Sequence, residues 1–388
     1  MNTELFDLEE MEITIEEFDA IEGEHKFSEE YQQKKQAMLK GYEHMLERKH
    51  KKHIRRLVAA IAVVCIVVPA TVYAAANHSD FFDNMFGNST KKNIDNYDVA
   101  VDDGKGGKVI VEMPAREYEA VDAEKAEELI GDKVFDGPIV KQLGDHTLTI
   151  ESVVYSKYGA QISFTLEREG GVTMFAGDDF SNQAKGAWFT EESQYSFYTM
   201  GTDGTYGGDM VYIDIEKSTP EKLYCYDYVV LEGLPEDAGL ALDITHYPAP
   251  MRERDNLTDE EEVEFYKKTE EETLVLSEQG QVPMFAYTSE TGGYLEVSAI
   301  SFCVYMSKGL GLSEGEASDP YHLNRIEIRY KDGSNYMVWD KEANIDNTGY
   351  LCGMLEPSGS IGIAFNRLVD TDAIDCILVN DVEYHLAE

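Results

Sequence analysis

Residues 57–76 have the sequence LVAAIAVVCIVVPATVYAAA, which contains no charged side chain. As a helix that rises 1.5 Å per residue, this stretch would be about 30 Å long, the thickness of the hydrocarbon core of a bilayer. Residues 48–56, RKHKKHIRR, lie directly before it, whereas residues 77–90 contain neither Lys nor Arg. Because segments rich in Lys and Arg stay in the cytoplasm, the sequence predicts a transmembrane helix over residues 54–76.

This helix predicts a single-pass protein of the cell membrane, with the N-terminus cytoplasmic, the C-terminus extracellular and the lipid bilayer as one partner. Two other interpretations are open. A cleaved signal peptide could end at the small residues Ala74–Ala76, but the segment before the apolar stretch is about twice as long as a whole signal peptide. A buried helix of a soluble core agrees poorly with the dense basic residues that precede it.

The composition limits the functions that the chain can have. The 388 residues contain 75 Asp and Glu against 33 Lys and Arg, a net charge of −42. Such a charge repels nucleic acid, so we expect no direct binding to DNA or RNA. A hydrophobic content of 43% is sufficient for packed cores, and the length beyond the apolar stretch favours two further domains.

The predicted cytoplasmic tail, residues 1–53, begins with a strongly acidic run that apolar residues interrupt. Thr14 with Glu17 forms the pattern of a capping box, and Ser28 can cap a second helix. The tail is therefore expected to be helical. It is either a solvated stem or a segment that binds a partner, because its apolar residues have no core of their own. The candidate partner-binding residues are Leu5, Leu8, Ile15, Phe18, Phe27 and Tyr31.

The rest of the chain predicts strands. Residues 77–137 are expected to form a connector with short helices, one of which ends at Ile130, and a glycine-rich turn at residues 102–107. Short runs of alternating or continuous apolar residues then predict a first β domain over residues 138–250 and a second β-sandwich domain over residues 251–388. The charged residues 251–272 at the start of the second domain are consistent with a capped helix, a strand or a linker.

Cysteine and histidine give no pattern of a catalytic or metal site. Four cysteines follow the apolar stretch, and buried free thiols are favoured over disulfides at Cys225, Cys303, Cys352 and Cys376. The histidines beyond it are single residues without metal-ligand spacing: His78, His146, His246, His322 and His385. We therefore expect no enzyme, no catalytic residues, no metal and no cofactor.

Four short motifs resemble a known family. They are Phe27-Ser28-x-x-Tyr31-x-x-Lys34-Lys35, residues 71–75 with Phe81-Phe82-x-x-Met85-Phe86-Gly87, the run TIESVVY at residues 149–155, and residues 365–370 with 374–377. With these motifs the chain resembles the Gram-positive single-span membrane proteins catalogued as domain of unknown function four-one-seven-nine, whose members are described as anti-sigma factors. The resemblance implies a cytoplasmic tail, one span, extracellular immunoglobulin-like sheets and no enzymatic activity. The chain departs from better-known anti-sigma factors, because no cysteine precedes Cys65 and the tail has no His-x-x-x-Cys-x-x-Cys zinc motif.

The expected fold class is thus a single transmembrane helix with a helical cytoplasmic tail and extracellular all-β, immunoglobulin-like sandwiches. The first functional hypothesis is a membrane-anchored regulator, an anti-sigma factor whose outer sheets sense an extracellular ligand and whose tail binds a cytoplasmic sigma factor. The alternative is an anchored adhesion or ligand-binding module without a regulatory tail.

Overall fold

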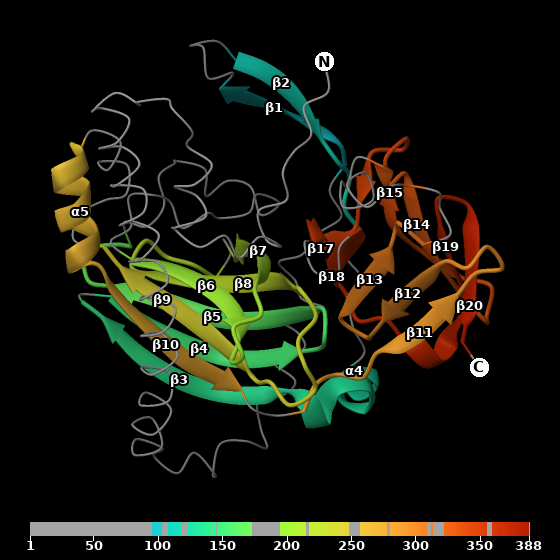
Figure 1. Ribbon diagram of the computed structural model, residues 1–388, viewed down its shortest axis with the longest axis horizontal. Coiled ribbons are helices and arrows are strands. Elements are labelled where there is room, and N and C mark those ends of the chain that lie inside the picture. The colour runs from blue at the N-terminus through green and yellow to red at the C-terminus, as the bar shows by residue number, and fades with distance from the viewer. Residues whose placement is uncertain are drawn as a thin grey trace, which may run out of the picture. The chain divides into compact units, whose positions relative to one another are not determined.

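The computed structural model describes residues 95–102, 108–117, 123–144, 146–172, 195–214, 217–247, 257–277, 280–308, 312, 322–354 and 359–387. These residues form mainly antiparallel β-sheets, which confirms the all-β, sandwich-like part of the prediction. Figure 1 shows the strands between residues 135 and 277 in one group and those between residues 285 and 386 in another. We call these groups the N-terminal β unit and the C-terminal β unit.

The predicted fold class of a single-pass membrane protein with a helical tail is wrong for the part of the chain that the structure describes. The α-helices there are α4 (Ala123–Ile130) and α5 (Asp259–Lys268), with 8 and 10 residues. Both carry several charged side chains, and at 1.5 Å per residue neither exceeds about 15 Å. No described helix is long and apolar enough to cross a bilayer, so the structure gives no basis for the predicted membrane localisation. Residues 1–53 and 54–76, on which these predictions rested, lie outside the described residues.

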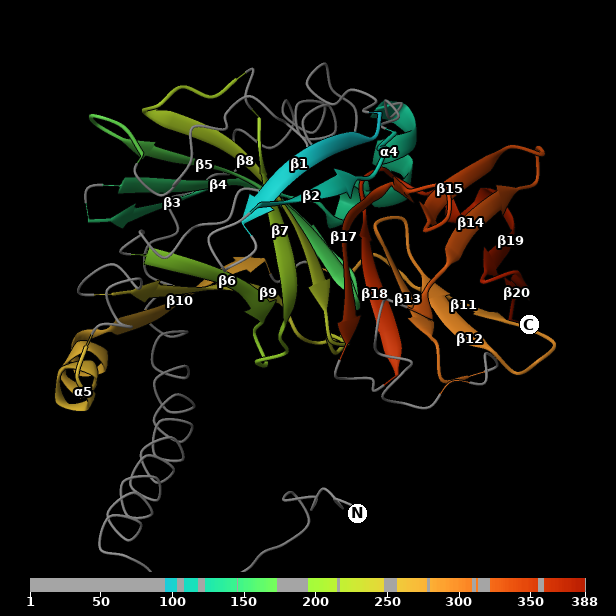
Figure 2. The ribbon, with the colours of Figure 1, turned by 90° about the horizontal axis from the view of Figure 1, so that it is seen from above.

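The N-terminal β unit is a sandwich of two sheets, which Figure 2 shows as separate layers. The larger sheet has the order β3 (Phe135–Leu143), β4 (His146–Tyr155), β5 (Gly159–Arg168), β8 (Lys222–Leu231) and β7 (Gly207–Ile213). The smaller sheet has the order β10 (Glu270–Ser277), β9 (Leu240–His246) and β6 (Tyr195–Gly201). Apolar side chains of both sheets form the core between them.

Strand β10 lies beyond residue 250, where the sequence predicted a domain boundary, yet it pairs with β9 from Glu270 onward. The N-terminal β unit therefore extends to Ser277. Helix α5, which precedes β10, begins with a capping box, so the capped helix is the alternative that is present among those left open for residues 251–272. The amide of Glu261 donates to Thr258 Oγ1 at 3.4 Å, and the amide of Thr258 donates to Glu261 Oε2 at 2.9 Å.

The C-terminal β unit is one ten-stranded sheet. Its order is β16 (Ile345–Asp346), β15 (Asn335–Asp340), β14 (Arg325–Tyr330), β19 (Ile374–Val379), β20 (Val382–Leu386), β11 (Phe285–Thr288), β12 (Tyr294–Val297), β13 (Ser301–Tyr305), β18 (Ser360–Phe365) and β17 (Thr348–Met354). Strands β16 and β17 are at opposite ends of this order, although only Asn347 separates them in the chain. The sheet must therefore curl until its ends meet, and it does so around one apolar core.

The segment after the ribbon of β1 (Tyr97–Asp102) and β2 (Lys108–Met113) covers one end of this curled sheet. Ala115 forms a parallel bridge with Ile345 of β16, and its amide donates to the carbonyl of Asn344 at 3.0 Å. We call residues 114–117 the strap. It adds backbone hydrogen bonds at a sheet edge that β16 would otherwise leave unpaired.

The five-stranded sheet is covered on both faces. Successive residues of β8 point to opposite faces. The core of the sandwich contains Cys225, Val229 and Leu231. The core against the C-terminal β unit contains Tyr226, Tyr228 and Val230. Strands buried on both faces are apolar nearly throughout and do not alternate with polar residues. This accounts for the continuous apolar run that the sequence shows at residues 223–231.

A charged network joins the two β units. The carboxylate of Glu296 on β12 accepts from Lys157 Nζ at 3.0 and 3.1 Å and from Tyr158 Oη at 2.8 Å, both in the β4–β5 turn. Tyr158 Oη also lies 2.7 Å from Tyr305 Oη. Because Glu296 is buried, these donors replace the water that its carboxylate gives up on folding.

Replacing Glu296 by Gln should weaken this junction, because the amide keeps the shape but loses the charge that Lys157 neutralises. We expect the free energy of unfolding to fall by about 1–3 kcal/mol, the usual range for hydrogen bonds to a charged group. Urea denaturation followed by circular dichroism measures this change. Glu264→Gln is the matched control, since its partner Lys267 is exposed on α5 and its loss should leave the unfolding midpoint unchanged.

Candidate functional site

The six predicted partner-binding residues lie outside the described residues, so the structure does not show how they are arranged: Leu5, Leu8, Ile15, Phe18, Phe27 and Tyr31. The candidate site is therefore built from the described part of the chain.

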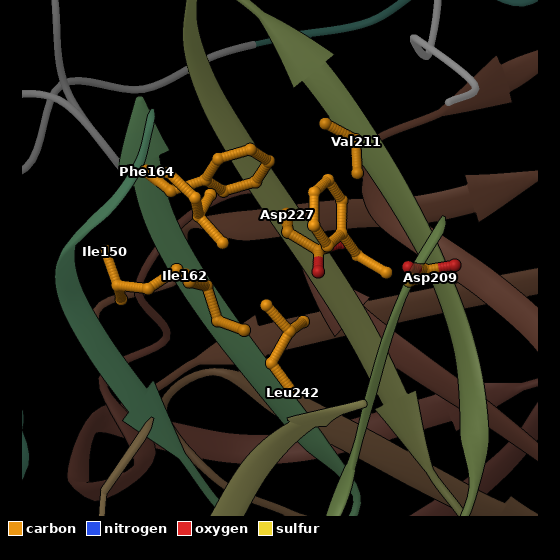
Figure 3. Close-up of a pocket in the computed structure, with 9 residues that line it drawn as sticks. Ile150, Ile162, Phe164, Asp209, Val211, Asp227 and Leu242 are labelled. Carbon is orange, nitrogen blue, oxygen red and sulfur yellow. The ribbon is translucent and has the colours of Figure 1, made fainter. Parts of the chain in front are cut away.

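A small cavity lies between the two sheets of the N-terminal β unit (Figure 3). Its walls are mainly apolar and include Ile150, Ile162, Phe164, Val211 and Leu242. The centre of a water molecule can occupy a volume of about 10 Å³ in this cavity, which is about the room that one water molecule needs. Two carboxyl groups, those of Asp209 and Asp227, complete the lining.

The register of β7 and β8 brings these carboxyls to one face of the sheet. Val211 is directly opposite Asp227, and Asp209 is directly opposite Val229. Because side chains alternate along a strand, Asp209 and Asp227 are diagonal neighbours on the face directed at the sandwich core, roughly 7–8 Å apart. Figure 3 shows both among the apolar side chains of the cavity.

Asp227 is incompletely hydrogen-bonded. Its exposed fraction is 4%, and its Oδ2 accepts a hydrogen bond from Thr199 Oγ1 on β6 at 3.2 Å. Its buried Oδ1 has no hydrogen-bond partner in the described part of the chain. A buried carboxylate oxygen without a donor is costly, so the protonated form of Asp227 is favoured.

Burial raises the pKa of both carboxyl groups. For Asp209, loss of hydration raises the pKa to about 6. For Asp227, burial raises the pKa well above its ordinary value, the charge of Asp209 raises it further, and the hydrogen bond from Thr199 opposes the shift. The two groups are coupled, so the pair holds on to a proton at pH values at which separate surface aspartates are ionised.

Two tyrosines lie near Asp209. Tyr198 on β6 donates from its Oη to the carbonyl of Gly207, and its pKa is raised by burial and then by the charge of Asp209. Tyr350 on β17 has a pKa raised mainly by burial, with the charges of Cys352 and Asp209 contributing. Asp209 is thus close both to the sandwich core and to a side chain of the C-terminal β unit.

The sequence did not single out Asp209 or Asp227. The available signal was a charged residue in the apolar run LYCYDYVVL, where Asp227 interrupts a strand that is otherwise buried. The partner of Asp227 could not be found in this way, because Asp209 follows two glycines near a turn and has no comparable context. Only the strand register brings the two together.

The residues that the sequence considered for metal or disulfide chemistry are separate. No group of three or more His, Cys, Asp or Glu residues in the described ranges is arranged to hold a metal ion. Cys225, Cys303, Cys352 and Cys376 are free thiols. Cys303 and Cys352 both pair with Gly362, one on each side, so their Cα atoms are two strand spacings or about 9.6 Å apart, too far for a disulfide.

The motif at residues 365–370 has a structural role. Asn366 Nδ2 donates to the carbonyl of Glu117 at 3.1 Å, and a guanidinium nitrogen of Arg367 lies 3.3 Å from the same oxygen. Arg116 donates from Nη1 to Tyr212 Oη at 2.6 Å and pairs through Nη2 with Asp346 at 3.1 Å. These contacts bind the strap to both β units.

Comparisons with known proteins give no family for this chain. No family model matches it, and no curated protein matches it. Among solved structures, the conserved domain protein from Bacillus anthracis is 11% identical, with a TM-score of 0.32, over 67% of this chain and 81% of that one. A likeness of this degree supports no conclusion about fold or function.

The carboxyl pair predicts a pH dependence of stability. Because the folded-state pKa values exceed the unfolded ones, the native state binds more protons, and stability falls as pH rises from about 4 through 6. Asp227→Asn removes one ionisation and the carboxyl group on which the charge of Asp209 acts. Between pH 4 and pH 7, we expect the free energy of unfolding of this variant to fall by about 1–3 kcal/mol less than that of the parent protein. Denaturant titrations at both pH values provide the measurement.

Asp243→Asn is the control for this experiment. Asp243 is also a buried aspartate of the sandwich, but its Oδ1 accepts from Thr273 Oγ1 at 3.1 Å and it does not line the cavity. This variant should keep the pH dependence of the parent protein. If the free energy of unfolding changed equally with pH in Asp227→Asn and in the parent, the result would contradict a proton shared by Asp209 and Asp227.

Proposed function

We propose that this protein is a regulator that binds a partner protein with a basic surface through its acidic segment at residues 1–53. The observation that carries the proposal is the charge of residues 1–30, which contain 12 Asp and Glu against one Lys, together with the apolar residues that interrupt this acidic run. A sigma factor is the partner class, because the motif at residues 27–35 is part of the resemblance to anti-sigma proteins.

Electrostatics and apolar contacts have different parts in this binding. The acidic side chains attract a basic, DNA-contacting surface over a distance that salt shortens, to about 10 Å at 0.1 M. The apolar residues supply the contact area once the two surfaces meet. This protein thereby competes with DNA for the same surface of the partner.

The β units support a regulatory function through their connection to the rest of the chain. The strap follows the β1–β2 ribbon and contacts both β units through Arg116 and Glu117. The part of the chain that leads toward residues 1–53 therefore starts from a segment that is hydrogen-bonded to both units.

Binding of the full chain to a purified Gram-positive sigma factor tests the proposal, by calorimetry at 50 and 300 mM NaCl. We expect a complex at low salt whose affinity falls at least tenfold at high salt. Simultaneous replacement of the six candidate residues by Ala should abolish it: Leu5, Leu8, Ile15, Phe18, Phe27 and Tyr31. No heat of binding to any sigma factor at 50 mM NaCl would refute the proposal.

A matched control uses apolar residues that are exposed on the β units. Ile110, Val140, Val263 and Leu386 have exposed fractions of 62, 61, 54 and 58%. Their joint replacement by Ala removes exposed apolar surface outside residues 1–53 and should leave the affinity unchanged. Equal losses in both variants would show non-specific apolar binding.

A further inference from the structure

Among the described strands, β7 is at the edge of the five-stranded sheet and forms ladder hydrogen bonds with β8 alone. Its two faces have different surroundings. Asp209 and Val211 line the cavity of the sandwich, whereas Met210 and Tyr212 belong to the core against the C-terminal β unit. A strand with one neighbour is the part of a sheet that separates most easily, so contacts on its two faces determine whether β7 stays in place.

The outer face of β7 is bound to the C-terminal β unit and to the strap. Tyr212 Oη donates to the carbonyl of Gly349 at 2.9 Å and accepts from Arg116 at 2.6 Å. At Gly208, a Cβ atom would come within 2.6 Å of Tyr350 Oη, so glycine permits this close approach. Movement of β7 would therefore break contacts with the C-terminal β unit and with the strap.

The inner face depends on the two carboxyls. Around them, β6 contributes Tyr198 and Thr199, and the groups from β4, β5 and β9 that line the cavity are apolar. Tyr350 of β17 lies on the outer face, against Gly208, where burial raises its pKa and the charge of Asp209 adds to the shift. In the described residues, no lysine or arginine forms an ion pair or hydrogen bond with either carboxyl. Ionisation of both would place two uncompensated negative charges against an apolar wall.

We propose that Asp209 and Asp227 form a proton-dependent latch, which holds β7 against β8 and the sandwich core while they retain a proton and releases β7 when both ionise. The proton passes to bulk water as pH rises, and water enters the cavity to hydrate the carboxylates. Because Tyr212 lies on the same strand, release also breaks its hydrogen bond with Arg116, while the strap stays bound to the C-terminal β unit through Asp346 and Asn347. This inference concerns the β units and does not depend on the proposed partner binding.

Hydrogen–deuterium exchange of the full chain between pH 5 and pH 8 tests the latch, with rates corrected for the intrinsic pH dependence of exchange. The peptide covering residues 207–213 should lose protection by at least about tenfold over this range, the change that one pKa unit of coupling supplies. A peptide covering β14, residues 325–330, should keep its protection.

Variants identify the group responsible. Asp227→Asn and, independently, Asp209→Asn should retain protection of β7 at pH 8, whereas Asp243→Asn should lose it as the parent does. If one Asn variant fails to fold, the other still tests the latch. Unchanged protection of β7 in the parent across the range, or the same loss in both Asn variants, would overturn the proposal.

Discussion

The burial of the five-stranded sheet on both faces is the constraint on which the rest of the structure depends. One face packs against the three-stranded sheet and the other against the C-terminal β unit. Strand β5 is buried along most of its length, and β8 likewise. A polar group on these strands cannot turn toward water, so each must find a partner inside the protein or remain uncharged.

Two buried carboxyl sites of the described structure meet the need for a partner in different ways. At the junction, Glu296 remains buried with Lys157 and Tyr158 as donors, which compensates its charge and fixes the contact between the β units. In the sandwich, Asp227 has Thr199 as its hydrogen-bond donor and Asp209 as its neighbour, so retention of a proton takes the place of a cation. The second arrangement responds to changes of pH, because its charge depends on that proton.

The C-terminal β unit avoids free sheet edges in a different way. A single residue, Asn347, connects the two end strands, and its side chain accepts from the amide of Glu117 at 2.6 Å and donates to the carbonyl of Met337 at 2.7 Å. The strap completes the closure at β16. Because the strap also contacts Tyr212 of β7, closure of one unit and the position of the edge strand in the other are physically connected.

The sequence by itself determined much of the local structure of the described chain: most of the strands and the helix ending at Ile130, with a capped helix among the alternatives at α5. These depend on neighbouring residues, through side-chain alternation and helix capping, and can be inferred from short segments. Its hydropathy also led to a membrane-anchored fold that no described helix supports, because one apolar stretch was extended to the whole architecture. Only the tertiary structure decided that β10 belongs to the first sandwich, that the ten-stranded sheet closes through Asn347 and that Asp209 meets Asp227. Each of these depends on strand register between distant segments, which a single sequence does not encode in any local pattern.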